Sequence, residues 1–297
     1  MRPLSLLALL TLASPLFAQA TLHQQISSIA QDAQGKVFVA CSLPGVALDC
    51  DLNAHGHPPM QSTFKLPLAI AVLQQVERGK LSLDQPIRFL PSDRYPGTYS
   101  PLQDAHPDAN IDVPLHELLQ LSVGKSDNTA SDILLRILGG PQVVQESMNK
   151  LGLQTIHIRD SERGLHDDFQ AQYRNDTEPA AMVTLLQLLA GHSPLNAEHT
   201  ALLNRWMTES TTGLHRIKGL LPADTLVAHK TGTSGERNGM APATNDIGLI
   251  TLPNGQRLAI AIFVTDSHAD EATRDGIIAR IAKAVYDRAL VAVATKP

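Results

Sequence analysis

The sequence is poor in cysteine, in basic charge and in long apolar runs, and each shortage excludes a class of protein. Two cysteines among 297 residues exclude a small scaffold held together by several disulfides. Lysine and arginine number 24 against 29 acidic residues, and no basic run is present to neutralise phosphates, so we expect no nucleic-acid partner. After residue 20, no apolar stretch approaches the roughly 18 residues needed to cross a membrane.

The first twenty residues form a segment of their own. Arg2 precedes a mostly apolar run from Leu4 to Phe17, and Ala18-Gln19-Ala20 has the small-x-small pattern that a signal peptidase cuts. Residues 1–20 are therefore predicted to be a signal peptide. We expect a periplasmic protein that is monomeric and makes no membrane contact after cleavage.

The two cysteines, Cys41 and Cys50, lie on either side of the turn residues Pro44-Gly45. Export would permit a disulfide between them. The alternative is that they are two small apolar residues, since a Pro-Gly turn would place Cys50 diagonal to Cys41. The sequence leaves both interpretations open.

Hydrophobic periodicity predicts a helix, two strands, a block of helices, three strands and a closing helix. The first helix begins near Leu22 and ends before Gly35. Strands are predicted at 36–41, 46–52, 225–230, 246–252 and 257–265, and further helices at 64–78, 113–121, 131–138, 142–151, 178–189 and 269–293.

This order of elements predicts an antiparallel sheet built from both ends of the chain, with a helical block inserted between its strands. We expect an α/β lobe formed by residues 21–61 and 209–297, and an all-α lobe formed by residues 62–208. A cleft between two such lobes is where a functional site is expected.

Three short motifs fall where they could line that cleft. Ser62-Thr63-Phe64-Lys65 opens a predicted helix, where serine and lysine share one face and unpaired N–H groups favour negative charge. Ser126-Asp127-Asn128 lies between two predicted helices, and Lys230-Thr231-Gly232 ends a predicted strand. Each motif alone is weak. Together, in this order, they match a signature of class A β-lactamases and penicillin-binding proteins.

The sequence resembles the class A serine β-lactamases, and within them the PER-type branch of extended-spectrum enzymes. The resemblance covers nearly the whole chain after the signal peptide and implies an α/β lobe packed on an all-α lobe. Its segments are the three motifs above with Met60-Gln61, Thr211-Thr212-Gly213, Lys218-Gly219-Leu220-Leu221-Pro222, Val227-Ala228-His229, Thr233-Ser234-Gly235 and Ala243-Thr244-Asn245-Asp246.

The resemblance implies hydrolysis of penicillins and cephalosporins, including oxyimino-cephalosporins, and hence β-lactam resistance. Ser62 would be the acylated nucleophile, with the backbone N–H groups of Ser62 and Thr233 as the oxyanion hole. Ser126 would pass a proton to the ring nitrogen. Either Lys65 directly, or Glu162 through water, would take the proton of the serine.

The resemblance also implies a set of substrate-binding residues. They are Tyr99, Asn128, Arg216, Lys230, Thr231, Gly232, Thr233 and Ser234. Asn128 would hold the acylamide, and Lys230 would attract the carboxylate. Tyr99 corresponds to an aromatic gate at the cleft mouth, although a core tyrosine is the alternative. Arg216 corresponds to a carboxylate-binding arginine, although a solvated surface charge is the alternative.

Glu162 separates a hydrolase from a transpeptidase, because hydrolysis of an acyl-enzyme needs a carboxylate that activates water. It lies in an omega-like loop, residues 159–177, which has no predicted helix or strand. His166 stands where the family commonly has an asparagine that helps hold the water. Asp160 stands where an arginine often ties the loop down. We therefore expect a rearranged loop without its usual staple, and a wider cleft.

Three other hypotheses are weaker. A D-alanyl-D-alanine carboxypeptidase would share the three motifs but not Glu162. A β-lactam sensor that stays acylated would need membrane helices. A zinc hydrolase built on His55-Gly56-His57, with Cys50 and Asp51 nearby, lacks the helical spacing of histidine ligands. We therefore expect no metal and no cofactor.

Overall fold

The structure is a computed structural model that describes residues 20–295. The predicted signal peptide lies outside the described residues except for Ala20. None of the helices in the described range combines the length and the apolar character that a membrane span requires.

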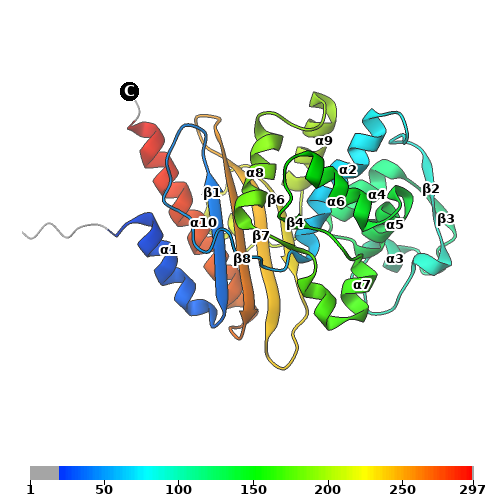
Figure 1. Cartoon of the computed structure of the whole chain (residues 1–297), viewed down its shortest axis with the longest axis horizontal. Helices are drawn as coiled ribbons and strands as arrows, with labels where there is room; N and C mark the ends of the chain where they lie inside the picture. The colour runs from blue at the N-terminus through cyan, green and yellow to red at the C-terminus, as the bar shows by residue number, and fades with distance from the viewer. Residues whose placement is uncertain (1–19, 296–297) are drawn as a thin grey trace, which may run out of the picture.

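A four-stranded antiparallel sheet forms the middle of the molecule, in the order β1-β8-β7-β6 (Figure 1). The first strand, β1, pairs along its length with β8, so that Lys36 lies opposite Thr265. The prediction of a sheet built from both ends of the chain is therefore confirmed. The strands are β1 Lys36–Ser42, β6 Val227–Thr233, β7 Ala241–Thr251 and β8 Arg257–Ser267.

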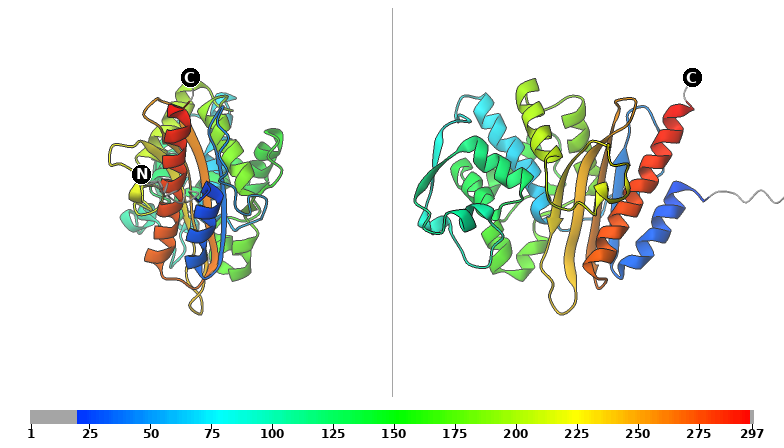
Figure 2. Two further views of the ribbon diagram at one scale, coloured as in Figure 1. Left: turned by 90° about the vertical axis from the view of Figure 1, so that its left-hand side faces the viewer. Right: turned by 180° about the vertical axis from the view of Figure 1, so that it is seen from behind.

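Helices cover both faces of this sheet. One face carries α1 (Leu22–Ala30) and α10 (Glu271–Ala294), which lie side by side (Figure 2). The other face carries the helical block, with α8 packed on β1, β7 and β8, and α9 on β6. The block consists of α2 Lys65–Glu77, α3 Pro101–Ala105, α4 Leu115–Gly124, α5 Asn128–Leu138, α6 Pro141–Lys150, α7 Glu162–Asp167, α8 Pro179–Ala190 and α9 Ala197–Thr208.

Short elements complete the chain. Two-stranded ladders join β2 to β3 and β4 to β5. Their bounds are β2 Pro86–Phe89, β3 Ile111–Pro114, β4 Ile156–His157 and β5 Asp176–Thr177, and the 3-10 helices are η1 Gln31–Ala33, η2 Gln61–Phe64, η3 Pro91–Asp93, η4 Phe169–Tyr173 and η5 Ile217–Leu220.

Successive side chains of β8 belong alternately to two separate hydrophobic cores. Ile260 and Ile262 pack with α1 and α10, whereas Ala261 and Phe263 pack with the helical block. Successive residues of a strand point to opposite faces, so a strand covered on both sides becomes an uninterrupted apolar run. This double burial fixes the register of β8 and, through it, the positions of β7 and β6.

Helix α2 is surrounded by the other helices and is buried from Lys65 to Leu73. It packs against α4, α5 and α6, so its apolar residues cover the whole circumference. A helix in this position has little freedom to shift. It therefore holds the side chains at its first turn in fixed places.

The predicted strand 46–52 is not present. Two isolated bridges, Leu43 to Val46 and Val39 to Leu52, are its only β-type pairings. The segment runs beside the edge strand β1 but pairs with it only at Val39 and Leu52, so it forms no continuous ladder. Its apolar residues alternate, but alternation alone does not supply a pairing partner.

The two cysteines form a disulfide. Cys41 and Cys50 are joined with their Cα atoms 6.0 Å apart, which is within the normal range for this bond. The bond ties the end of β1 to the irregular segment that follows it. Of the two interpretations that the sequence leaves open, the structure has the disulfide.

Replacing both Cys41 and Cys50 with alanine should destabilise the protein. Opening a loop with a sequence separation of 9 returns conformational entropy to the unfolded chain, which corresponds to about 2–3 kcal/mol. We expect the melting temperature to fall by roughly 5–10 °C. Calorimetry of both proteins without reductant measures this, and an unchanged melting temperature would show that the bond does not constrain the chain.

Candidate active site

The segment that contains Ser62 is clamped between the sheet and the helical block. Ser62 lies in η2, immediately before α2, and Gln61 adopts a left-handed conformation with φ of 48°. Asn245 of β7 donates from Nδ2 to the carbonyl of Met60 at 3.1 Å. A Cβ on Gly232 would lie 2.4 Å from the same carbonyl oxygen, so only glycine lets β6 approach this closely.

Lys65 is fully buried and joins three segments of the chain. Its Nζ donates to the carbonyl of Ser126 at 2.7 Å and to Oδ1 of Asn128 at 2.6 Å. The same Nζ lies 2.9 Å from Oε1 of Glu162. A buried ammonium requires this full set of acceptors, because an unpaired charge in the interior is costly.

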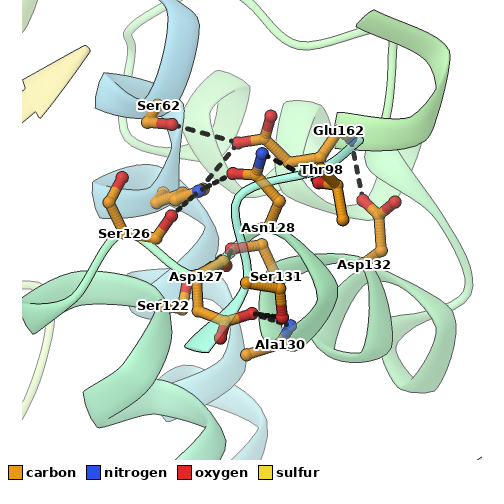
Figure 3. Close-up of polar contacts among 12 residues, drawn as sticks. Ser62, Thr98, Ser122, Ser126, Asp127, Asn128, Ala130, Ser131, Asp132 and Glu162 are labelled. Atoms are coloured by element: carbon orange, nitrogen blue, oxygen red, sulfur yellow. Dashed lines mark hydrogen bonds and ion pairs between the residues drawn. The ribbon is translucent and has the colours of Figure 1, made fainter. Parts of the chain in front are cut away.

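Glu162 completes the link to the serine. Ser62 Oγ donates to Glu162 Oε1 at 3.2 Å, and Glu162 itself is 5% exposed (Figure 3). Glu162 begins α7, whose N-cap is Ser161. The start of this helix points the carboxylate at the first turn of α2.

Asp132 of α5 holds the backbone at Glu162. Its carboxylate accepts from the N–H of Glu162 at 2.7 Å and from the N–H of Arg163 at 2.9 Å. Burial, which is the larger cause, and the negative charge of Glu162 together raise the pKa of Asp132 to about 7. Asp132 is not in any motif, but it lies four residues after Asn128 and so shares its helix face.

Lys230 and Ser126 form a second pair. Lys230 Nζ donates to Ser126 Oγ at 2.8 Å and to the carbonyl of Thr231 at 2.9 Å. Burial lowers the pKa of Lys230 well below its ordinary value, and the nearby charge of Lys65 lowers it further. Ser126 itself has a φ of 59°, a left-handed conformation that turns its side chain toward β6.

The loop between α4 and α5 is fixed by a buried carboxylate. Asp127 accepts from Ser100 Oγ at 2.8 Å and from the N–H of Leu102 at 2.7 Å. The N–H of Asn128 donates to the carbonyl of Tyr99 at 3.0 Å. Tyr99 is 57% exposed, which excludes the alternative that it is a core residue.

A cavity of about 370 Å³ opens in front of these groups. Lys65, Ser126 and Lys230 are not among its lining residues: Lys65 donates to the lining residue Asn128, and Lys230 donates to Ser126. Six of the predicted site residues line it: Ser62, Asn128, Glu162, His166, Thr233 and Ser234.

Arg216 does not line this cavity and is not a surface charge. It is 3% exposed, and its Nε donates to Oδ1 of Asp275 at 2.7 Å. Its Nη1 donates to the carbonyls of Gly232 at 3.2 Å and Asn245 at 3.0 Å. The guanidinium therefore holds β6 and β7 together, and the alternative of a solvated surface charge is wrong. A role for Arg216 in binding the substrate carboxylate stays a prediction.

Two predicted substrate-binding hydroxyls have partners within the protein. Thr231 Oγ1 and Thr212 Oγ1 are 2.7 Å apart. Ser234 Oγ donates to the carbonyl of Ala243 at 3.2 Å and accepts from its N–H at 2.9 Å. Ser234 would have to release the carbonyl of Ala243 before its hydroxyl could donate to a substrate, whereas Thr231 can accept from Thr212 and keep its own O–H for a substrate.

The predicted irregular loop, 159–177, contains α7, η4 and β5. Its expected lack of a staple is wrong: Asp160 and Arg174 form two hydrogen bonds, both of 2.8 Å. Asn175, which is fully buried, accepts from the N–H groups of Arg159 at 2.8 Å and Asp160 at 3.0 Å. The loop is therefore tied by an ion pair in which residue 160 supplies the acid and Arg174 the arginine.

His166 packs against the ring of Tyr95, with centroids 5.5 Å apart. Its Nδ1 lies 3.1 Å from Oδ1 of Asp167. The ring lines the cavity near Glu162. A role for His166 in holding water stays a prediction.

Comparison with known proteins gives the family. A model described as the β-lactamase enzyme family matches residues 21–289. The extended-spectrum β-lactamase PER-1 of Pseudomonas aeruginosa is 40% identical over 265 residues, which cover 89% of this chain and 86% of that protein.

Two solved structures agree with this match. A β-lactamase from Chitinophaga pinensis has a TM-score of 0.85 and 41% identity, covering 90% of this chain and 99% of that one. A class A β-lactamase from Bacteroides cellulosilyticus has a TM-score of 0.84 and 34% identity, covering 91% and 98%. The chain therefore belongs to the β-lactamase enzyme family, and within it to the class A serine enzymes.

Proposed function

We propose that this β-lactamase opens the β-lactam amide through an acyl-enzyme on Ser62, and that Glu162 serves as the base in both halves of the reaction. One observation carries the proposal. A single oxygen, Oε1 of Glu162, lies 3.2 Å from Ser62 Oγ and 2.9 Å from Lys65 Nζ. The carboxylate that would receive the serine proton is thus already hydrogen-bonded to the serine.

Acylation begins with loss of the Ser62 proton. The three N–H groups of Lys65 have three acceptors, so Lys65 donates and has no lone pair directed at Ser62. The proton therefore passes to Glu162, directly or through one water. Lys65 stabilises the developing negative charge by its position and remains charged.

The leaving nitrogen needs a proton, and Ser126 is placed to give it. Ser126 Oγ accepts from Lys230 Nζ, so its own O–H is free to point into the cavity. The lowered pKa of Lys230 makes its ammonium a stronger acid. Ser126 passes its proton to the ring nitrogen and receives one from Lys230.

The oxyanion would be held by the backbone N–H groups of Ser62 and Thr233. Both residues line the cavity, one from η2 and the other from the end of β6. Two preorganised donors of this kind are worth several kcal/mol when charge develops on the carbonyl oxygen. Asn128 and the cavity end of β6 would bind the acylamide and the carboxylate of the substrate.

Deacylation reuses the same carboxylate, after the proton that Glu162 took from Ser62 has left to solvent and Lys230 has regained from solvent the proton that it gave to Ser126. Once Ser62 is esterified, it no longer donates to Glu162, and Oε1 is free to take a proton from water. Asp132 keeps Glu162 in place through the backbone N–H groups that it accepts. The family match is with β-lactamases, which does not favour a D-alanyl-D-alanine carboxypeptidase.

The substrate range that we propose includes oxyimino-cephalosporins. The cavity runs beyond Ser62 to Leu165 and Phe169 on the loop side and to Glu236 and Arg237 on the strand side. Large acylamide substituents would lie against these residues once the Arg237 guanidinium, 4.8 Å from the centre of the Phe169 ring, moves aside. Export to the periplasm and a monomeric state remain predictions from the sequence.

Replacing Glu162 with glutamine should trap the acyl-enzyme. Glutamine keeps the size of the side chain but cannot accept a proton, so both steps lose their base, and hydrolysis of the ester should slow more than attack of Ser62 on the strained amide. Steady turnover of a chromogenic cephalosporin should fall at least about a hundredfold. Intact-mass spectrometry should show one added substrate mass on the variant.

The matched control adds Ser62→Ala to the Glu162→Gln variant, which should abolish the added mass. Unchanged steady turnover in Glu162→Gln would reject Glu162 as the deacylating base. A rapid burst followed by no turnover in the unsubstituted protein would instead support the carboxypeptidase.

The raised pKa of Asp132 predicts that the stability of the protein depends on pH. Its pKa is about 7 in the folded protein and about 3.8 in the unfolded chain, so the folded state binds the proton more tightly. The stability that Asp132 contributes is fully present below about pH 4 and is lost as the pH rises through about 7. Asp132→Asn cannot titrate, so the stability of the natural protein relative to this variant should fall between pH 4 and pH 7.

Urea unfolding of both proteins across this pH range measures the difference. Asp112→Asn, which changes an exposed carboxylate in a surface ion pair, serves as the control. Parallel stability profiles for the natural protein and Asp132→Asn would contradict the raised pKa.

A further inference from the structure

Three side chains outside the active site converge on one point at the protein surface. The Nδ1 atoms of His57 and His157 each lie 2.8 Å from the same oxygen, Oδ1 of Asp176. Candidate ligand atoms of the three residues all lie within 4.8 Å of one another. The two imidazole rings stack with centroids 5.5 Å apart and planes inclined by 14°.

This cluster has the composition of a site for a borderline divalent metal. Two imidazole nitrogens and one carboxylate oxygen are typical ligands of zinc, whereas calcium and magnesium prefer oxygen atoms alone. Both rings aim a nitrogen at one oxygen atom, so one cation placed among these atoms would replace two hydrogen bonds. We propose that His57, His157 and Asp176 bind one zinc ion.

The geometry requires only a small adjustment. Zinc bonds of about 2.0–2.2 Å place neighbouring ligand atoms roughly 3.4 Å apart in a tetrahedral site. The nitrogen-to-oxygen distances of 2.8 Å would therefore widen by a few tenths of an ångström. Rotation of the exposed His57 side chain, which is 44% exposed, can supply this change without moving the backbone.

Solvent and a neighbouring carboxylate complete the surroundings. His157 is 29% exposed and Asp176 is 16% exposed, so an ion and its water can enter. Oε1 of Glu178 lies 3.9 Å from Nε2 of His57, and its Oε2 is 3.0 Å from Nδ1 of His55. The negative charge of Glu178 favours a cation here, and a water molecule fills the fourth position.

The ligands come from three segments that meet at the base of the omega-like loop. His157 and Asp176 are opposite each other in the β4–β5 ladder, which closes that loop. Asp176 also bridges to Pro59, and the N–H of Met60 donates to the carbonyl of Asn175 at 2.7 Å. A bound ion would therefore fasten the loop that carries Glu162 to the segment that leads to Ser62.

This proposal differs from the zinc hypothesis set aside on sequence grounds. That hypothesis joined His55 and His57 to Cys50, but Cys50 is in a disulfide and has no thiolate to offer. The second imidazole comes instead from residue 157, one hundred residues along the chain. Ser62 and Glu162 take no part in the site, so the ion would stabilise the loop and would not perform the hydrolysis.

Zinc binding to the mature protein tests the proposal. The protein is prepared without a histidine tag, stripped with a chelator and titrated with zinc chloride in a calorimeter. We expect one equivalent per chain. His57→Ala and His157→Ala should each weaken binding at least about tenfold, while His192→Ala, which removes an exposed histidine elsewhere, should leave it unchanged.

Two further measurements keep the test independent of whether the variants fold. Zinc should raise the melting temperature of the natural protein, as any ligand specific for the folded state does. Cobalt(II) in place of zinc should shift the ring signals of two histidines in the NMR spectrum. No binding at large molar excess of zinc, or binding that survives both histidine substitutions, would overturn the proposal.

Discussion

A lysine ammonium buried at the start of α2 is the interaction on which the active site depends. An ion in the interior is tolerated only when acceptors surround it, because the penalty for leaving it unpaired is several kcal/mol. Lys65 finds its acceptors in Ser126 and Asn128, which belong to one motif, and in Glu162, which comes from a separate segment. The need to satisfy one charge therefore brings together the groups that surround Ser62.

The sequence predicts well whatever depends on local pattern. Helical spacing placed α2, α5, α6 and α8 within a few residues, and the alternating or buried runs placed the three C-terminal strands. The three motifs also predict which residues lie close together, because they are residues that act on one substrate. The structure places Lys65 beside Asn128 and Lys230 beside Ser126. The antiparallel sheet followed from the order of elements alone.

The failures share a physical cause, which is dependence on a partner distant in the sequence. The strand expected at 46–52 alternates correctly but meets its neighbour β1 at a single bridge, between Val39 and Leu52. Arg216 carries a charge that Asp275 neutralises, and no local pattern shows that it is buried. An acidic residue at position 160 predicts that the omega-like loop lacks its ion pair, yet Arg174 supplies the opposite charge. The sequence near Asp160 does not show this partner, which lies at the far end of the loop.

The pairing of β1 with β8 also sets an order of assembly. Lys36 and Thr265 are neighbours in space but lie near opposite ends of the chain, so the loop between them closes only at a large entropic cost. During synthesis β1 emerges first and has no partner until β8 follows. A nascent chain that stops before β8 therefore exposes a bare strand edge, and we expect such a fragment to aggregate.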